Sequence, residues 1–278
     1  MTREKVIHCG KYGVKSKYIE IDLYHVSGKP IKRRGRSKKH NISSPTQAKL
    51  NAKNAARYLN QLSKTNFTSK DYHISLTYDE LPSSVEEAET DFKNYIRRVN
   101  HRRKMKGLKN AKYICVTETS KNGRVHHHVI MENGLPREET EMLWSRARIN
   151  WLKYDRMSQT EKEEYAGKVK LIGFANTQRL QFNNKGIEEL TAYLSKDPQG
   201  RRRWKQSRNL IKPWYMTPKD GRYSRRKMEK MALLPQDCEE VRQFWERKYK
   251  SYILDEARPE FNPVTGLWSI YLKMHLKD

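Results

Sequence analysis

The sequence predicts an α+β fold in which an antiparallel sheet is flanked by helices. Segments with the two-residue alternation typical of strands are interspersed with segments of helical periodicity between residues 68 and 200. An Asn-Gly turn at 122–123 joins two of the strand-like segments into a hairpin. A mixed order of hairpins and helices is typical of an α+β sandwich, which is therefore the class we expect.

The individual elements follow from periodicity and from capping or turn residues. Residues 17–26 alternate like a half-buried strand, and Ser44-Pro45 begins a helix that runs to about Ser63. The expected central order is strand 73–78, helix 85–104, strand 112–118, strand 125–131, helix 137–150, weaker strands over 169–183 and helix 185–196. Near the end, Cys238–Ile253 has the pattern of an amphipathic helix, and 266–276 that of a strand at a sheet edge.

Composition points to a polyanionic partner. The net charge is +26 with a sequence pI of about 9.9, which favours nucleic acid first and an anionic membrane surface second. No run of apolar residues is long enough to span a bilayer, and MTREKVIHCG lacks the apolar core of an export signal. The three cysteines are far apart and suggest neither disulfides nor a zinc ribbon. We therefore expect a cytoplasmic protein with no membrane partner.

Three regions are expected along the chain, and basic residues are concentrated in the outer two. Residues 1–67 form a basic N-terminal extension with a strand hairpin and a helix, and residues 68–200 form the domain with the candidate chemistry. Residues 201–278 form a basic, aromatic-rich region that either binds DNA or completes the core. The extension contains IKRRGRSKKH at 31–40, either a solvated arm or a phosphate-contacting one.

The start of the C-terminal region combines cations with aromatic rings. Between Arg201 and Lys230 there are twelve Lys/Arg and two acidic residues, with Trp and Tyr interleaved. Such aromatic residues either stack on bases or form a small hydrophobic core of their own. The basic and aromatic residues expected to contact DNA are Arg33, Arg34, Arg36, Arg124, Arg201, Arg202, Arg203, Trp204, Arg208, Arg225 and Arg226.

The most informative segment is Tyr113–Met131, YICVTETSKNGRVHHHVIM. Because side chains alternate between the two faces of a strand, His126 and His128 point to one face and His127 to the other. Three consecutive histidines therefore offer two convergent ligands. We expect His127 to be a structural residue in an apolar row, and His127→Val to be tolerated.

The length of the hairpin loop decides whether Glu118 joins the two histidines. A two-residue loop would place Glu118 opposite His127, whereas a three-residue loop with Gly123 in the left-handed region would place it opposite His126. We predict the three-residue loop with a bulge. A carboxylate and two imidazoles on one face leave open coordination positions, as a catalytic divalent ion requires. The alternative is that these histidines are ordinary surface residues of a strand.

A candidate nucleophile lies in the segment 184–198, NKGIEELTAYLSKDP. Its apolar residues form one helical stripe, and Tyr193 lies on the flank of that stripe with Lys196 three residues later. A tyrosine in such a position is usually part of a core. The alternative is a nucleophile, whose attack on phosphorus would be helped by a metal ion and by a lysine that stabilises developing charge. The pattern Y-x-x-K is weak alone and gains weight downstream of the predicted metal ligands.

Together these patterns resemble the HUH endonucleases, and among them the rolling-circle replication initiators of small phages, plasmids and single-stranded DNA viruses. The resemblance covers about residues 70–200. The segments similar to the three family motifs are HISLTYDE at 73–80, GRVHHHVIM at 123–131 and YLSK at 193–196. In the family the middle position of the second motif is normally apolar, and here it is His127.

The resemblance implies roles for particular residues. It implies a ferredoxin-like or RRM-like sheet and an Mg²⁺ or Mn²⁺ ion bound by Glu118, His126 and His128. Tyr193 matches the family nucleophile and Lys196 its helper. The LTY strand of the first motif implies an origin-binding face, so that Thr77 and Tyr78 are expected to contact DNA.

The resemblance also implies a reaction and its partners. Single-stranded DNA at an origin hairpin would be cleaved to leave a 5′-phosphotyrosine link and a free 3′-hydroxyl primer, and the strands would later be rejoined. The third motif has a single tyrosine, which implies a second protomer in a transient dimer or a re-used tyrosine. No G-x-x-x-x-G-K-[ST] loop is present, so a separate helicase is expected in addition to a polymerase.

Three other functions remain open on the sequence alone. A one-tyrosine HUH transposase would share the catalytic residues and recognise element ends. A non-catalytic DNA-binding protein with a relic metal site would bind DNA without needing Tyr193. A protein that packages nucleic acid by charge would bind in a salt-sensitive manner without any metal dependence.

Overall fold

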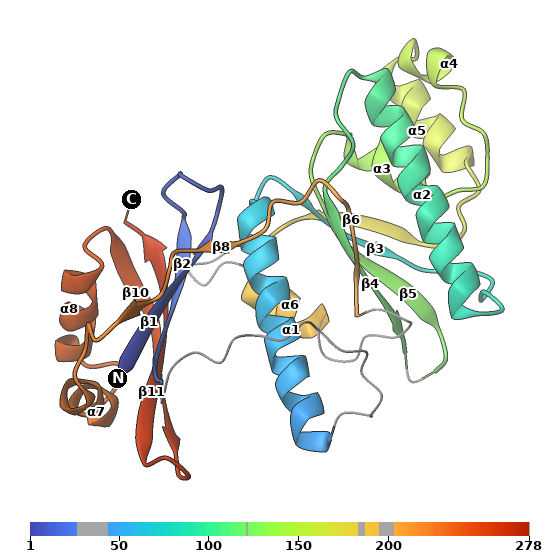
Figure 1. Ribbon diagram of the computed structural model, residues 1–278. Helices are drawn as coiled ribbons and strands as arrows, with labels where there is room; N and C mark the ends of the chain where they lie inside the picture. The colour runs from blue at the N-terminus through green and yellow to red at the C-terminus, as the bar shows by residue number, and fades with distance from the viewer. Residues whose placement is uncertain (27–43, 121, 183–186, 195–202, 278) are drawn as a thin grey trace. The chain divides into compact units, whose positions relative to one another are not determined.

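The computed structural model describes residues 1–26, 44–120, 122–182, 187–194 and 203–277. They form two compact units. The central unit spans Asn66–Phe182 and Ile187–Leu210, and the terminal unit combines Met1–Thr65 with Ile211–Asp278. Each unit has its own antiparallel sheet with flanking helices (Figure 1). The predicted α+β class is confirmed.

The central unit is built on a five-stranded sheet with the strand order β6-β3-β5-β4-β7. Every pairing in this sheet is antiparallel. Its strands are β3 (Tyr72–Leu76), β4 (Tyr113–Thr119), β5 (Val125–Met131), β6 (Ala175–Arg179) and β7 (Lys205–Gln206). Because β5 lies between β3 and β4, side chains on β5 have neighbours from both of these strands.

One face of the central sheet forms the main apolar core of the unit. Apolar residues of β3 and β5 pack there with Phe92, Tyr95 and Val99 of α2 (Val85–Met105). These three residues recur at helical spacing, so they form a single buried stripe. The helix begins after Ser84, whose hydroxyl accepts a backbone N–H of the first turn as an N-cap does.

The predicted helix over 137–150 is wrong in its extent. In the structure α3 (Arg137–Met142) is short, and a separate helix α4 (Trp151–Asp155) begins nine residues after its end. Trp144, in the segment between them, donates its indole N–H to the carbonyl oxygen of Thr77 at 2.8 Å. Trp144 is fully buried, so packing and hydrogen bonding to the strand segment outweigh helix propensity in this segment.

The remaining central helices differ from expectation in number and length. The helix α5 (Gln159–Lys168) was not predicted, although Ser158 and Glu161 form a complete capping box that the sequence displays. The predicted weak strands over 169–183 reduce to β6. Of the helix predicted over 185–196, the structure describes α6 (Glu188–Leu194).

Gly173 lies just before β6, where the chain passes against the backbone that follows β3. A Cβ at this position would meet the carbonyl oxygen of Thr77 and would lie 2.6 Å from Cα of Tyr78. Both contacts are backbone, so the two segments would have to separate. We therefore expect Gly173→Ala to lower the free energy of unfolding by about 1–3 kcal/mol in urea denaturation.

Gly167 provides the control for this prediction. A Cβ at Gly167, within α5, would meet nothing within 4 Å, so Gly167→Ala should leave the stability unchanged or raise it. Equal denaturation midpoints for Gly173→Ala and the wild type would contradict the close packing described for this segment.

The terminal unit joins the two ends of the chain in one sheet. The strand order is β10-β11-β2-β1-β8, and β9 also pairs with β1. The strands are β1 (Thr2–Cys9), β2 (Tyr18–His25), β8 (Trp214–Tyr215), β9 (Lys219–Asp220), β10 (Tyr252–Asn262) and β11 (Leu267–Leu276). The sequence did not predict β1 or β10. The strand predicted at 266–276 lies between β10 and β2 rather than at a sheet edge.

Helices cover both faces of the terminal sheet. On one face, Ile21 and Leu272 pack with Trp245 in an apolar cluster that includes residues of α7 (Arg225–Leu233) and α8 (Glu239–Lys248). The helix α8 ends earlier than the helix predicted over 238–253, because the chain turns into β10. The helix α7 was not predicted.

The other face of the terminal sheet packs against α1 (Pro45–Asn66), and this packing is partly ionic. Glu20 and Asp22 alternate along β2 with the apolar residues of the opposite face. Arg57 of α1 donates to Glu20 at 2.7 Å and to Asp22 at 2.9 Å. A buried carboxylate such as Glu20 needs such a partner, so this pair orients α1 on the sheet.

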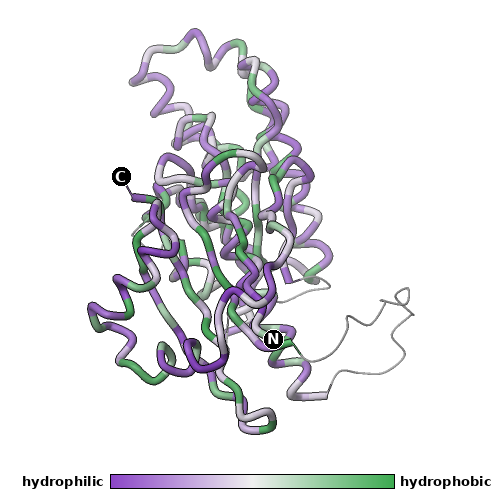
Figure 2. Tube along the Cα trace, turned by 60° about the vertical axis from the view of Figure 1, so that its left-hand side comes forward, coloured by the Kyte–Doolittle hydropathy of each residue, from purple (hydrophilic) through white to green (hydrophobic). Residues whose placement is uncertain are grey.

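The distribution of hydropathy agrees with this layered arrangement. Figure 2 shows hydrophobic residues concentrated along the strands, whereas the connections and the outer sides of the helices are largely hydrophilic. Among the described residues, no helix is long and apolar enough to cross a membrane.

Candidate metal centre

The β4–β5 hairpin has the register that the sequence predicts. Glu118 is paired with His126 across the two strands. The N–H of Ser120 donates to the carbonyl oxygen of Arg124 at 2.8 Å, so the three residues 121–123 separate the last bonded pair. Gly123 has a φ of 75°, in the left-handed region where glycine is favoured. The three-residue loop is confirmed, while residue 121 itself lies outside the described residues.

Glu118, His126 and His128 converge on one face of the sheet. The Oε2 atom of Glu118 lies 3.3 Å from Nε2 of His126 and 3.6 Å from Nε2 of His128. One potential ligand atom from each residue falls within 4.8 Å of the others. Their side chains are 15%, 22% and 12% exposed, which shields them from bulk water and leaves them reachable by an ion. This cluster could hold a metal ion.

The chemistry of these donors fits a divalent ion with open coordination positions. Two imidazole nitrogens and a carboxylate oxygen suit a transition ion such as Mn²⁺ better than Mg²⁺, which prefers oxygen ligands. Burial lowers the pKa of His128 to about 4, and the neighbouring His126 and His73 act in the same direction. His128 is therefore neutral at neutral pH, as a metal ligand must be.

His127 lies on the opposite face of the same strand and is fully buried, as strand parity predicts. Its Nδ1 atom is 2.9 Å from the hydroxyl of Thr117, and its Nε2 atom is 2.9 Å from the hydroxyl of Tyr78. The Tyr78 hydroxyl also lies within donating distance of the carbonyl oxygen of Ala88, at 3.3 Å. Burial lowers the pKa of His127 to about 3. His127 is a bonded core residue and does not compete for the metal.

This environment changes the expectation for His127→Val. The substitution removes the imidazole that bonds to the buried Thr117 hydroxyl, so we now expect a loss of about 1–3 kcal/mol in unfolding free energy at neutral pH. Mn²⁺ affinity should be unchanged, because the side chain lies on the face away from Glu118. Urea denaturation and an Mn²⁺ titration test the two statements separately, and a loss of Mn²⁺ binding would contradict the assignment of faces.

The same variant should also change the acid sensitivity of the protein. The pKa of His127 is lowered from 6.5 to about 3 in the folded state, so protons bind the unfolded chain first. Unfolding free energy should therefore fall as the pH drops from 6.5 toward 3, and the His127→Val variant should lack this contribution. Denaturation at pH 7 and at pH 5 in both proteins measures the difference; parallel losses would contradict the prediction.

The predicted nucleophile belongs to the same unit as the cluster. Tyr193 lies in α6, which is part of the central unit. Ile187 and Thr191 are 2% and 1% exposed, so the predicted stripe of this helix is buried. The side chain of Tyr193 is outside the described part of the structure, and so is Lys196.

The predicted DNA contacts divide into three groups. Those outside the described residues are Arg33, Arg34, Arg36, Arg201 and Arg202. Those exposed on the central unit are Arg124, Arg203 and Arg208, and those exposed on the terminal unit are Arg225 and Arg226. Trp204 is partly buried and donates its indole N–H to the side chain of Gln206 at 2.7 Å.

The two residues predicted from the first motif have different environments. Thr77 is partly buried, and its hydroxyl donates to the carbonyl oxygen of Phe174 at 3.1 Å. Tyr78 is only 8% exposed and its ring lies in the apolar core, where it contacts the rings of His127 and Trp144. A core side chain cannot stack on DNA, so we withdraw Tyr78 from the predicted contacts and treat it as a partner of His127.

The sequence analysis did not single out His73 as a site residue, although it begins the first motif. In the structure Nε2 of His73 lies 3.3 Å from Nδ1 of His128. The signal that could have found it is parity, because His73 shares a face with His128 once β3 and β5 are paired.

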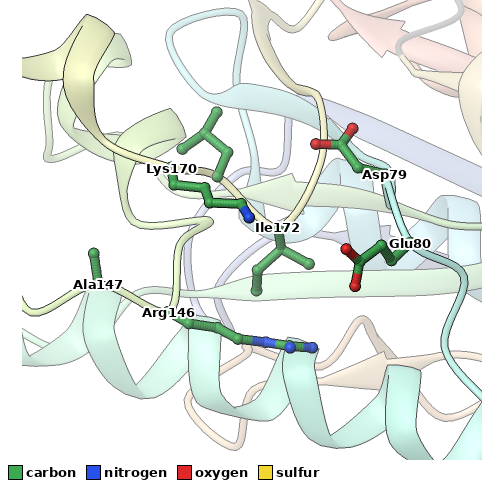
Figure 3. A pocket seen from close by; sticks show the side chains of 7 residues that line it. Asp79, Glu80, Arg146, Ala147, Lys170 and Ile172 are labelled. Carbon is green, nitrogen blue, oxygen red and sulfur yellow. The ribbon is translucent and has the colours of Figure 1, made fainter.

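The central unit also has a pocket of about 420 Å³ away from the predicted site residues. Its lining includes the carboxylates of Asp79 and Glu80 and the cationic groups of Arg146 and Lys170 (Figure 3). Two charges of each sign give this pocket no net attraction for a polyanion. We therefore assign it no part in the function.

Comparison with known proteins gives one family match. Residues 71–198 match a family of replication-associated proteins, the ORF2 type. Neither the curated proteins nor the solved structures include a significant match to this chain. The matched segment, somewhat less than half of the chain, contains Glu118, His126, His128 and Tyr193. The similarity of this segment supports a replication initiator family, and with it an interaction with DNA.

Proposed function

We propose that this protein is a rolling-circle replication initiator of the HUH class, which nicks single-stranded DNA at an origin through Tyr193. The observation on which the proposal depends is the convergence of Glu118, His126 and His128 within the segment that matches the replication-associated family. A cluster of this kind in a DNA-interacting family favours metal-assisted phosphoryl transfer over simple DNA binding.

The metal would be held by Glu118, His126 and His128, with Mn²⁺ or Mg²⁺ as the candidate ions. When bound, a divalent ion polarises the scissile phosphate and neutralises charge that develops on its oxygens. The two histidines lie on a central strand of the sheet, so the ligands need little rearrangement to bind an ion.

The chemical step is assigned to Tyr193. Its phenolic oxygen loses a proton and attacks the phosphorus, a new P–O bond forms to the tyrosine, and the bond to the 3′ oxygen breaks. The leaving 3′ oxygen takes up a proton, which yields a free 3′-hydroxyl primer and a 5′-phosphotyrosine link. Lys196 is proposed to stabilise the negative charge that develops during attack. Strand rejoining is the reverse of this step.

DNA contacts are proposed for exposed cations on both units. Arg124 lies in the hairpin loop beside the metal cluster and is well placed to contact a phosphate near the scissile bond. In the terminal unit, α7 begins with Arg225, Arg226 and Lys227 and has no acid in its first turn. Cations at a helix N-terminus are electrostatically unfavourable, so their presence favours a polyanionic partner.

The proposal includes partners that complete a replication round. A separate helicase and a polymerase would unwind and extend the DNA, because the sequence has no P-loop for nucleotide hydrolysis. A transient dimer or a re-used Tyr193 would end the round. The site of action is proposed to be the cytoplasm.

A covalent-adduct gel tests the proposed function. The protein is mixed with labelled single-stranded DNA from its own replicon, with Mn²⁺ or with EDTA. We expect a denaturant-resistant protein–DNA band that requires the metal. DNA binding without an adduct on any segment of the replicon would favour a non-catalytic DNA-binding protein, and an adduct confined to the ends of a mobile element would favour a transposase.

A further inference from the structure

A third histidine contacts the metal cluster from the neighbouring strand. Nε2 of His73 lies 3.3 Å from Nδ1 of His128, and the two rings are nearly parallel, with centroids 5.5 Å apart and an interplanar angle of 14°. In the register of β3 and β5, Ser75 is opposite His128 and His73 is opposite Ile130. His73 is therefore the diagonal neighbour of His128, a position from which a long side chain can reach it.

The two nitrogens of the His128 ring face different partners. Nε2 lies 3.6 Å from the Glu118 carboxylate, on the side where the ion would bind, whereas Nδ1 lies beside His73. His73 contacts the nitrogen of His128 that is turned away from the cluster. It is consequently not one of the clustered ligands found among the described residues, which are Glu118, His126 and His128.

This arrangement determines which nitrogen of His128 should hold the proton. A hydrogen bond between two neutral imidazoles needs one N–H and one lone pair. If Nδ1 of His128 holds the proton, it donates to Nε2 of His73, and the lone pair of His128 Nε2 is directed at the cluster. In the other tautomer Nε2 holds the proton and cannot bind an ion.

We propose that His73 is a positioning residue that holds His128 in the Nδ1–H tautomer and so presents its Nε2 lone pair to the metal. This inference rests on the proposed metal centre. Metal-ligating histidines commonly donate their second N–H to an acceptor, which fixes the ring and raises its basicity. Here the acceptor is a histidine on β3, which pairs with β5 on one side and β6 on the other, so the sheet holds it in place.

Two substitutions separate the acceptor from the bulk of the His73 ring. His73→Phe keeps a planar ring of similar size and removes the acceptor, whereas His73→Gln retains a carbonyl oxygen that can accept from Nδ1. We expect Mn²⁺ affinity to fall by about 10- to 100-fold in His73→Phe and to recover largely in His73→Gln. Ser75→Ala, opposite His128 on the same strand, is the matched control and should bind Mn²⁺ as the wild type does.

A second readout follows the proton directly and needs neither DNA nor turnover. Nitrogen-15 NMR of the metal-free protein reports which nitrogen of His128 is protonated, and we expect Nδ1–H in the wild type and His73→Gln. His73→Phe should shift the population toward Nε2–H. An unchanged tautomer and unchanged Mn²⁺ affinity in His73→Phe would overturn the proposal, and so would a His73→Gln variant as impaired as His73→Phe.

The outcomes also separate this inference from the proposed nicking activity. A wild-type protein that binds Mn²⁺ with the expected dependence on residue 73 but forms no DNA adduct would support the role of His73 and argue against the nickase. A wild type that binds no Mn²⁺ would overturn the role of His73 together with the metal centre.

Discussion

Tyr193→Phe is expected to abolish the covalent protein–DNA adduct and to leave DNA binding unchanged. The substitution removes a single oxygen atom, the proposed nucleophile, and keeps the aromatic ring. Loss of a nucleophile commonly lowers turnover by three or more orders of magnitude, so we expect cleavage to fall by at least about 1,000-fold. The adduct gel measures the first statement, and a fluorescence-anisotropy titration with single-stranded DNA measures the second.

Tyr165→Phe is the matched control for this experiment. Tyr165 lies in α5 of the same unit and has no proposed role in the reaction, so its variant should form the adduct at the wild-type rate. Adduct formation by Tyr193→Phe would mean that another residue is the nucleophile. Loss of DNA binding in the same variant would point to a structural role for the hydroxyl.

His126→Ala is expected to lower Mn²⁺ affinity by more than the 10- to 100-fold typical of a residue behind the ligands, and therefore by at least about 100-fold. The reason is that His126 supplies one of the three clustered ligand atoms, 3.3 Å from the Glu118 carboxylate. Cleavage at a fixed low Mn²⁺ concentration should be lost in parallel. Isothermal titration calorimetry measures the affinity directly.

The two variants should respond differently to excess metal. Raising the Mn²⁺ concentration should restore part of the cleavage by His126→Ala, because binding is weakened by mass action, and none of the cleavage by Tyr193→Phe. His101→Ala, an exposed histidine on α2, is the control and should bind Mn²⁺ normally. Wild-type Mn²⁺ affinity in His126→Ala would contradict the assignment of the metal centre.

The sequence by itself determined the local geometry of the hairpin. Strand alternation assigned His126 and His128 to one face and His127 to the other, and the loop ending in Gly123 predicted the pairing of Glu118 with His126. These features depend on interactions between residues close in the chain. A period of two and a short turn leave few alternatives, so local sequence is sufficient to specify them.

Helix boundaries were predicted less well where distant contacts compete with local propensity. The helix expected over 137–150 ends early because Trp144 is buried and bonded to the carbonyl oxygen of Thr77, which is 67 residues away in the chain. By contrast α2 begins at its predicted position because Ser84 caps it locally. A local cap is visible in sequence, whereas a partner from another strand is not.

Only the tertiary structure decided which distant segments meet. It joined β2 to β11, so that the two ends of the chain form one unit, a question that the sequence had left open. It placed Tyr78 in the core, and it brought His73 to Nδ1 of His128 across paired strands. Such contacts depend on strand order, and strand order is set by the burial of whole apolar faces rather than by any short motif.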